Sequence, residues 1–129
     1  MLRIKREIFD EMIKYCKECL PYEACGILAG KDNVVTKIYK IKNTENSPVS
    51  YFMEPRQQLL AMKEIREYGM DMLAIFHSHP YGSANPSYKD LELAFYDVYY
   101  IIVAFEPKFE VKCFKIKNKK SEPQQLHIE

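Results

Sequence analysis

The sequence predicts an α/β fold in which a mixed β-sheet is flanked by helices. Residues 98–105 form a nearly unbroken apolar run, which is typical of a central strand covered on both faces. In residues 6–20, the apolar side chains Ile8, Met12, Cys16 and Leu20 recur at every fourth position, as on one face of an amphipathic helix. Patterns of these two kinds alternate along the chain, which favours helices packed on a sheet.

The first half of the chain should contain three strands and two helices. The expected elements are a strand over 2–5, a helix over 6–20, strands over 24–29 and 34–41, a polar loop over 43–50 and a helix over 55–69. A turn-rich link over 30–33 joins the strand pair. Pro55 suits a first helical turn, and Gly69 suits a helix C-terminus.

The second half should add a short helix and further strands. The expected elements are a strand over 72–77, a helix from Ser87 to about residue 95, the strand over 98–105 and an edge strand over 124–128. Phe109, Val111 and Cys113 alternate with charged residues, as a half-exposed strand does. Two nonpolar residues adjoin at Cys113-Phe114, and this change of phase predicts a β-bulge there.

Length and composition indicate one domain over residues 1–129. With 129 residues, of which 47% are hydrophobic, the chain can bury a single core and has no room for a second. The net charge of +1 argues against a nucleic-acid partner. The N-terminus lacks the apolar core of a signal peptide, and the longest apolar run is far below transmembrane length. We therefore expect no membrane contact and a cytoplasmic location.

The four cysteines are expected to be reduced thiols that pack as small hydrophobic side chains. Cys16 and Cys19 form a CxxC pair, but a zinc ribbon needs a second pair, which Cys25 and Cys113 do not provide. A redox CxxC normally begins a helix, whereas this pair falls late in the predicted helix.

Two histidines separated by one residue follow the apolar run over 72–76, at the end of the strand predicted over 72–77. Side chains at i and i+2 of a strand share a face, so His77 and His79 should leave the strand end together. Imidazole and carboxylate are ligands of Zn²⁺, and three protein ligands plus a water make a catalytic site. Asp90, eleven residues past His79, is the expected third ligand. Ser78 should point to the opposite face as a structural residue, and His127 should lie on the surface.

Ser87 and Asp90 also have the spacing of a helix N-terminus, with Ser as the cap and an acid three residues on. The turn-forming pair Asn85-Pro86 precedes them. Both interpretations are compatible, because a capped helix start would hold Asp90 towards the metal. A serine without an activating histidine is a poor nucleophile, and both nearby histidines are assigned to the metal. Ser87 is therefore expected to donate a hydrogen bond to a developing oxyanion, in addition to capping.

These residues resemble the motif of the JAMM (MPN-plus) zinc metalloproteases. That motif is an upstream glutamate, then H-S/T-H, seven residues, Ser, two residues and Asp. This chain has HSH at 77–79, seven residues, Ser87, two residues and Asp90. The upstream glutamate fits Glu23, because PYEACGILAG at 21–30 is similar to the family's P-x-E-x-C-G-x-L-x-G. The resemblance extends from residue 3 to about 117 and implies a mixed α/β architecture like that of cytidine deaminases.

The resemblance also implies a role for Glu23 as the general base that takes a proton from water and passes it to the leaving amine. Zn²⁺ bound by two neutral histidines and one carboxylate lowers the pKa of a bound water to about 7 and polarises a carbonyl oxygen. Cys25 lies two residues beyond Glu23 and is expected to pack beside it on the same strand face.

The reaction implied by the resemblance is hydrolysis of a peptide or isopeptide bond after the C-terminal glycines of a ubiquitin-like protein. The chain is similar in size to stand-alone prokaryotic members, some of which release cysteine or another adduct from sulfur-carrier proteins. The expected partner is the Gly-Gly tail of such a carrier, added as a strand at an exposed sheet edge. The leaving group, the physiological metal and a homodimer stay open.

Three other functions stay open on the sequence alone. A zinc amidohydrolase acting on cell-wall or phage-type peptides would use the same centre. A non-catalytic scaffold of the same fold is disfavoured, because such relatives lose metal ligands and this chain keeps them. A DNA-associated relative of the RadC type shares an H-x-H-P motif, but the near-neutral charge of this chain argues against it.

Overall fold

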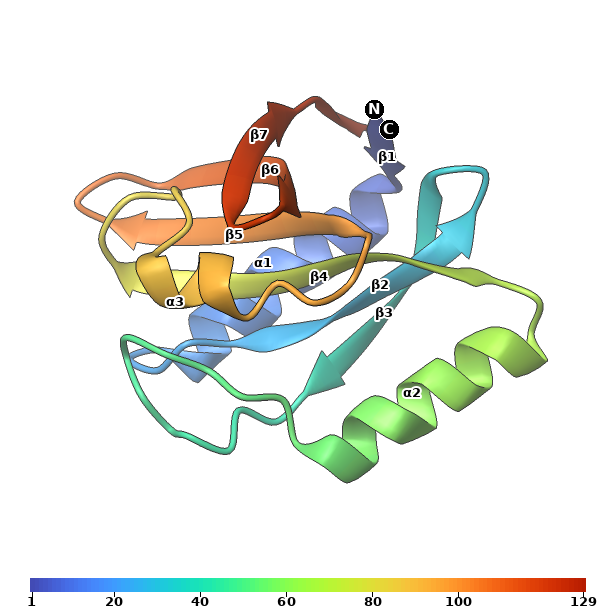
Figure 1. The fold of residues 1–129 in the computed structure, drawn as a ribbon, viewed down its shortest axis with the longest axis horizontal. Helices are drawn as coiled ribbons and strands as arrows, with labels where there is room; N and C mark the ends of the chain where they lie inside the picture. Colours follow the sequence, from blue (N-terminus) through green and yellow to red (C-terminus); the bar gives the residue numbers. More distant parts are fainter.

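A computed structural model describes residues 1–129 as eight strands and three helices (Figure 1). The elements are β1 (Leu2–Ile4), α1 (Arg6–Cys19), β2 (Cys25–Lys31), β3 (Val34–Ile41), α2 (Pro55–Glu67), β4 (Asp71–Tyr81), α3 (Tyr88–Glu92), β5 (Tyr99–Glu106), β6 (Glu110–Lys117), β7 (Lys120–Gln124) and β8 (Leu126–Ile128). The predicted α/β class is confirmed.

All eight strands belong to one mixed sheet with the order β7-β6-β5-β4-β2-β3-β1-β8. β4 lies near its centre, antiparallel to β2 and parallel to β5. Only Gln125 separates β7 from β8, although these strands stand at opposite ends of the order. The sheet therefore curls until the C-terminal segment borders both ends. Figure 1 shows the two chain termini side by side where β1 meets this segment.

An apolar core covers each face of the sheet, and α1 and α2 pack on opposite faces (Figure 1). Met12 and Cys16 of α1 belong to one core, and Ala61 and Ile65 of α2 belong to the other. Successive residues of β5 alternate between the two cores, as the period of a strand requires. This arrangement confirms the prediction that the 98–105 run is a strand covered on both faces.

The ends of α2 follow the local chemistry predicted for them. Pro55 occupies the first turn, and the Glu54 side chain accepts hydrogen bonds from the backbone N–H groups of Arg56 and Gln57. Gly69 has a φ of +67°, which glycine adopts without steric cost just past a helix end. The link between β2 and β3 is a two-residue turn at Asp32 and Asn33, both with positive φ.

The structure corrects the predicted end of the strand that carries the histidines. β4 runs to Tyr81, so His79, like His77, stands within the strand rather than beyond it. β5 continues to pair with β4 there, with His79 opposite Ala104 and Tyr81 opposite Glu106. The expectation that the strand ends at 77 was wrong because it followed the apolar run over 72–76, whereas non-local pairing with β5 extends the strand to Tyr81.

Helix α3 ends at Glu92, three residues before the predicted end. The Tyr100 hydroxyl donates to the carbonyl of Tyr96 and accepts from its N–H, each at 3.1 Å. These bonds hold the segment after α3 against β5 and out of the helix.

The bulge expected at Cys113-Phe114 is absent, because β5 and β6 pair in continuous register. The two residues are buried in opposite cores, which explains why adjacent positions are both nonpolar. The edge strand expected over 124–128 is instead two strands, β7 and β8. β7 begins earlier, at Lys120, because Asn118 and Lys119 adopt positive φ and form a tight hairpin turn with β6.

None of the three helices is both long enough and apolar enough to cross a membrane.

Candidate metal centre and active site

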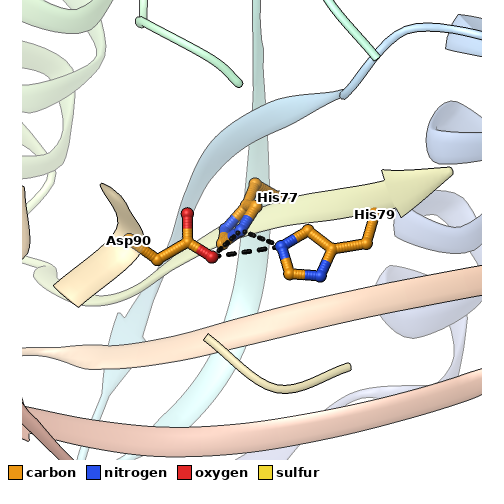
Figure 2. Close-up of side chains that lie close together, drawn as sticks. All are labelled: His77, His79 and Asp90. Carbon is orange, nitrogen blue, oxygen red and sulfur yellow. Dashed lines mark hydrogen bonds and ion pairs between the residues drawn. The ribbon is translucent and has the colours of Figure 1, made fainter. Parts of the chain in front are cut away.

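The side chains of His77, His79 and Asp90 converge at one point (Figure 2). Both histidines project from the same face of β4, and Asp90 projects from α3. The Nε2 atoms of His77 and His79 and the Oδ2 atom of Asp90 are each 3.1 Å from the other two. The structure therefore brings together the three residues that the sequence predicts as metal ligands.

The size and chemistry of this triangle fit a zinc ion. Ligands at about 2.0–2.1 Å from a tetrahedral Zn²⁺ lie about 3.3 Å from each other, close to the observed 3.1 Å. The Nδ1–H of His79 donates to the carbonyl oxygen of Ser83 at 2.7 Å, which leaves the Nε2 lone pair facing the centre. Tyr51 stacks on the ring of His77, with centroids 4.7 Å apart and planes 28° apart, and fixes its orientation.

Burial and hydrogen bonding set the charge of the cluster. Burial lowers the pKa of His77 and outweighs its interactions with Asp90. Burial alone would raise the pKa of Asp90, but bonds from both histidines and the Ser87 N–H hold it well below its usual range. Burial also acts to lower the pKa of His79, yet bonds to Asp90 and Ser83 raise it above its usual value. Because a metal binds only the neutral imidazole, the raised pKa of His79 shifts metal binding towards higher pH.

Glu23 is only 4% exposed, and its carboxyl lies close enough to the metal centre to interact with the charges of His79 and Asp90. Burial raises the pKa of its carboxyl to about 8, while the charge of His79 opposes this shift and that of Asp90 adds to it. Its Oε1 atom is buried and has no hydrogen-bond partner in the protein. A carboxyl group held in this way is available to exchange a proton with a group that enters the centre.

Ser78 fixes the position of Glu23 relative to the histidines. Its Oγ accepts the N–H of Ala24 at 2.8 Å, and its own N–H donates to the Ala24 carbonyl at 3.0 Å. Ser78 is fully buried, and these two bonds tie the start of β2 to β4 between the two ligands. The structural role predicted for Ser78 agrees with this geometry.

Ser87 caps α3 as predicted. Its Oγ accepts the N–H of Asp90 at 3.1 Å, while its own N–H donates to Asp90 Oδ2 at 2.9 Å. The residue is exposed, and its hydroxyl proton is not used in the cap. Ser87 can therefore cap the helix and also donate a hydrogen bond to an oxyanion. The structure shows the cap.

The sequence did not point to Asn43, which organises the loop beside Glu23. Its Nδ2 donates to the carbonyls of Glu23 and Ser50, each at 3.1 Å, and its Oδ1 accepts from the N–H groups of Glu45 and Phe52, each at 3.0 Å. All hydrogen bonds of this buried amide are thus satisfied. Neither this residue nor the stacking role of Tyr51 carries a motif or periodic signal in the sequence.

The cysteines and His127 lie where the sequence predicts. All four cysteines are free, and Cys16, Cys25 and Cys113 are buried. Burial raises the pKa of the Cys25 thiol to about 12, and its Sγ contacts the Ile41 carbonyl at 3.4 Å, consistent with packing. His127 is exposed in β8.

Residues 5–117 match the family described as prokaryotic homologs of the JAB domain. The chain is 39% identical to the desampylase of Pyrococcus furiosus over 101 residues, which are 78% of this chain and 72% of the relative. It is 33% identical to a probable TtuB-protein conjugate cleaving protease of Thermus thermophilus, over 79% of this chain and 69% of the relative. It is 27% identical to the CysO-cysteine peptidase of Mycobacterium tuberculosis, over 90% and 83% of the two chains.

Solved structures agree with this relationship. A protein of Desulfitobacterium hafniense superimposes with a TM-score of 0.89 and 35% identity, covering 100% of this chain and 93% of the other. A structure described as a JAMM metalloprotease-like zinc site in the proteasome and signalosome has a TM-score of 0.64 at 23% identity, covering 99% and 97% of the two chains, and supports the fold. By sequence and fold, the chain belongs to the prokaryotic homologs of the JAB domain and is a peptidase of the JAMM type.

Proposed function

We propose that this chain, as a single domain over residues 1–129, is a cytoplasmic zinc peptidase that cleaves the bond after the C-terminal Gly-Gly of a ubiquitin-like or sulfur-carrier protein. The observation that carries the proposal is the 3.1 Å triangle of His77, His79 and Asp90 beside the buried carboxyl of Glu23. The names of the relatives support the substrate class, because they refer to a TtuB-protein conjugate and to CysO-cysteine.

Each residue of the centre has a proposed task. Zn²⁺ held by His77, His79 and Asp90 would acidify a water molecule and polarise the scissile carbonyl. Glu23 takes the proton of the attacking water and passes it to the departing amine, so that water and amide become a carboxylate and a free amine. The Ser87 hydroxyl donates to the oxygen on which negative charge develops.

The proposed partner is the carrier protein, and the part of it that enters the active site is its C-terminal tail. An extended tail gains main-chain hydrogen bonds, as in strand addition. Two glycines at the scissile bond let the tail backbone approach the metal centre closely, because they carry no Cβ. The released group is cysteine or another amine attached through a peptide or isopeptide bond.

The test is cleavage of a carrier extended beyond its Gly-Gly, followed by mass spectrometry. The protein is stripped with a chelator, reloaded with zinc and incubated with the extended carrier and with an Ala-Ala control tail. We expect cleavage directly after the second glycine, only with metal and only on the Gly-Gly tail. A zinc-loaded protein that leaves the Gly-Gly tail intact but cleaves a cell-wall peptide would overturn the substrate assignment. A protein that binds no metal and cleaves neither would be a scaffold.

A further inference from the structure

A hollow of about 200 Å³ adjoins the metal centre, and the chemistry proposed above does not use it. Asp90 lies on its border, so the hollow is continuous with the centre. One wall is formed by residues 50–53 of the loop before α2, and the other by residues after α3, including Leu93, Phe95 and Tyr96. Ile75 of β4 and Tyr100 of β5 close its base.

The lining of the hollow selects for an apolar occupant. The Tyr96 hydroxyl is bonded to Gln58 Nε2 at 3.2 Å, and the Tyr100 hydroxyl is bonded to the backbone of Tyr96. With these hydroxyls engaged, the walls present mainly aromatic and aliphatic carbon. An apolar protein cavity of about 150 Å³ binds benzene, so this hollow has room for one aromatic or branched aliphatic side chain.

The walls of the hollow are fixed to each other before any substrate binds. Lys89 of α3 contacts Glu45 of the loop at 3.0 Å, and the Ser50 hydroxyl donates to the same carboxyl oxygen. Asn43 ties the loop to the backbone at Glu23. The hollow is therefore preformed, which reduces the entropy lost when a side chain enters.

The proposed roles of Glu23 and Ser87 indicate which part of the substrate lies at this hollow. Glu23 must face the leaving nitrogen, and this residue lines a different hollow with Cys19, Tyr22 and Asn46. Ser87 must face the carbonyl oxygen, and it begins α3, which borders the hollow next to Asp90. The acyl part of the substrate therefore runs along α3.

The two glycines at the scissile bond have no side chain that could enter the hollow. An extended strand advances about 3.3 Å per residue, so the next side chains of the tail are those within reach. The geometry points to the hollow as a specificity pocket for an apolar side chain carried by one of the two tail residues that precede the Gly-Gly. This inference rests on the proposed function and adds a sequence requirement to the carrier tail.

The test compares tails that differ only before the Gly-Gly and carry the same leaving group. The series has Ala-Ala, Leu-Ala, Ala-Leu, Asp-Ala and Ala-Asp at those two positions. For the zinc-loaded wild type, we expect kcat/KM to be about 10- to 100-fold higher for one of the leucine tails than for alanine at that position. Aspartate at the same position should lower kcat/KM below the alanine value.

Two variants assign the preference to the pocket. Leu93→Trp fills the hollow from a side chain that is 44% exposed, and Phe95→Asp places a charge at its rim from a side chain that is 78% exposed. In each variant the ratio of leucine to alanine kcat/KM should fall to about one. The control is Leu59→Trp, on the exposed side of α2, which should keep the ratio of the wild type.

The possible outcomes distinguish a failure of the pocket assignment from a failure of the proposed function. If the wild type cleaves all five tails equally, the function stands and the pocket assignment is wrong. Full preference in both Leu93→Trp and Phe95→Asp, with normal melting curves, would also refute the pocket. If the zinc-loaded wild type cleaves no tail, the proposed function itself is wrong.

Discussion

Ser87 and Asp90 cap each other across the first turn of α3, and the Asp90 oxygen that accepts the Ser87 N–H also lies 3.1 Å from both histidines. One carboxylate oxygen thus belongs to both the helix start and the metal centre. The reciprocal bonds restrict the Asp90 rotamer before a metal binds, which reduces the entropy lost on coordination.

Because of these reciprocal bonds, Ser87→Ala should affect the helix cap and turnover but not the metal content. The variant loses the cap acceptor and the hydroxyl donor, but the backbone N–H that holds Asp90 remains. We expect a loss of roughly 1 kcal/mol in stability, retained zinc and a fall in kcat of about 10²–10³-fold. Ser87→Thr keeps the hydroxyl and serves as the control. Near-normal turnover by Ser87→Ala below its melting transition would leave Ser87 as a helix cap only.

Metal content should depend on each of the three ligands. We expect one zinc per chain in the wild type and its loss in His77→Ala and Asp90→Ala, because three protein ligands leave no redundancy. His127→Ala removes an exposed histidine far along the chain in β8 and should keep the metal. Elemental analysis after gel filtration measures this directly. Equal zinc in all four proteins would disprove the site.

Asn43 should matter for both stability and turnover. Asn43→Ala leaves the buried carbonyl of Glu23 and the partly buried backbone groups of Ser50 and Phe52 without this partner, at a cost of about 1–3 kcal/mol in the free energy of unfolding. Turnover should fall as well, because the loop no longer fixes the backbone of Glu23. Thr44→Val removes a single exposed hydrogen bond to Phe52 and should change little in urea unfolding. Equal losses in the two variants would contradict the organising role of Asn43.

The buried carboxyl of Glu23 should make the metal-free protein less stable as pH rises. Its pKa is about 8 in the fold and about 4.3 in an unfolded chain, so the folded state holds a proton that the unfolded state releases. The stability linked to this proton is fully present below the unfolded pKa and is lost through the window from about 4.3 to 8. The slope is at most about 1.4 kcal/mol per pH unit.

Comparison with Glu23→Gln isolates this contribution. His79, Asp90, Lys89 and Glu45 are the charged groups that act on Glu23, and all four are present in both proteins. Chelator-treated wild type should therefore lose more stability than Glu23→Gln between pH 5 and 7.5 in urea titrations. Parallel pH profiles of the two proteins would show that Glu23 is not buried as described.

The sequence predicts the ligands of the centre because their chemistry is local. The spacing of the HSH segment, Ser87 and Asp90 encodes both the shared face of β4 and the helix cap. Burial of residues on both faces of β5 also follows from one apolar run. Signals of this kind depend on neighbours in the chain and on the periods of strand and helix.

The features that the sequence misses depend on contacts between distant segments. Extension of β4 past Pro80 needs β5, and the division of the C-terminal segment into β7 and β8 needs partners at both ends of the sheet. Asn43 acts through backbone groups whose positions only the folded loop defines. The roles of Glu23 and Ser87 in turnover stay predictions, because a fold without substrate does not test them.

The measurement that tests the central claim most directly is zinc content and turnover in Glu23→Gln. The substitution keeps the size of the side chain and removes its capacity to take a proton, while His77, His79 and Asp90 are unchanged. We predict about one zinc per chain, as in the wild type, and a fall in turnover of roughly 10²–10⁴-fold on a Gly-Gly carrier conjugate. Loss of zinc would make Glu23 a ligand, and wild-type turnover with full zinc would show that the general base lies elsewhere.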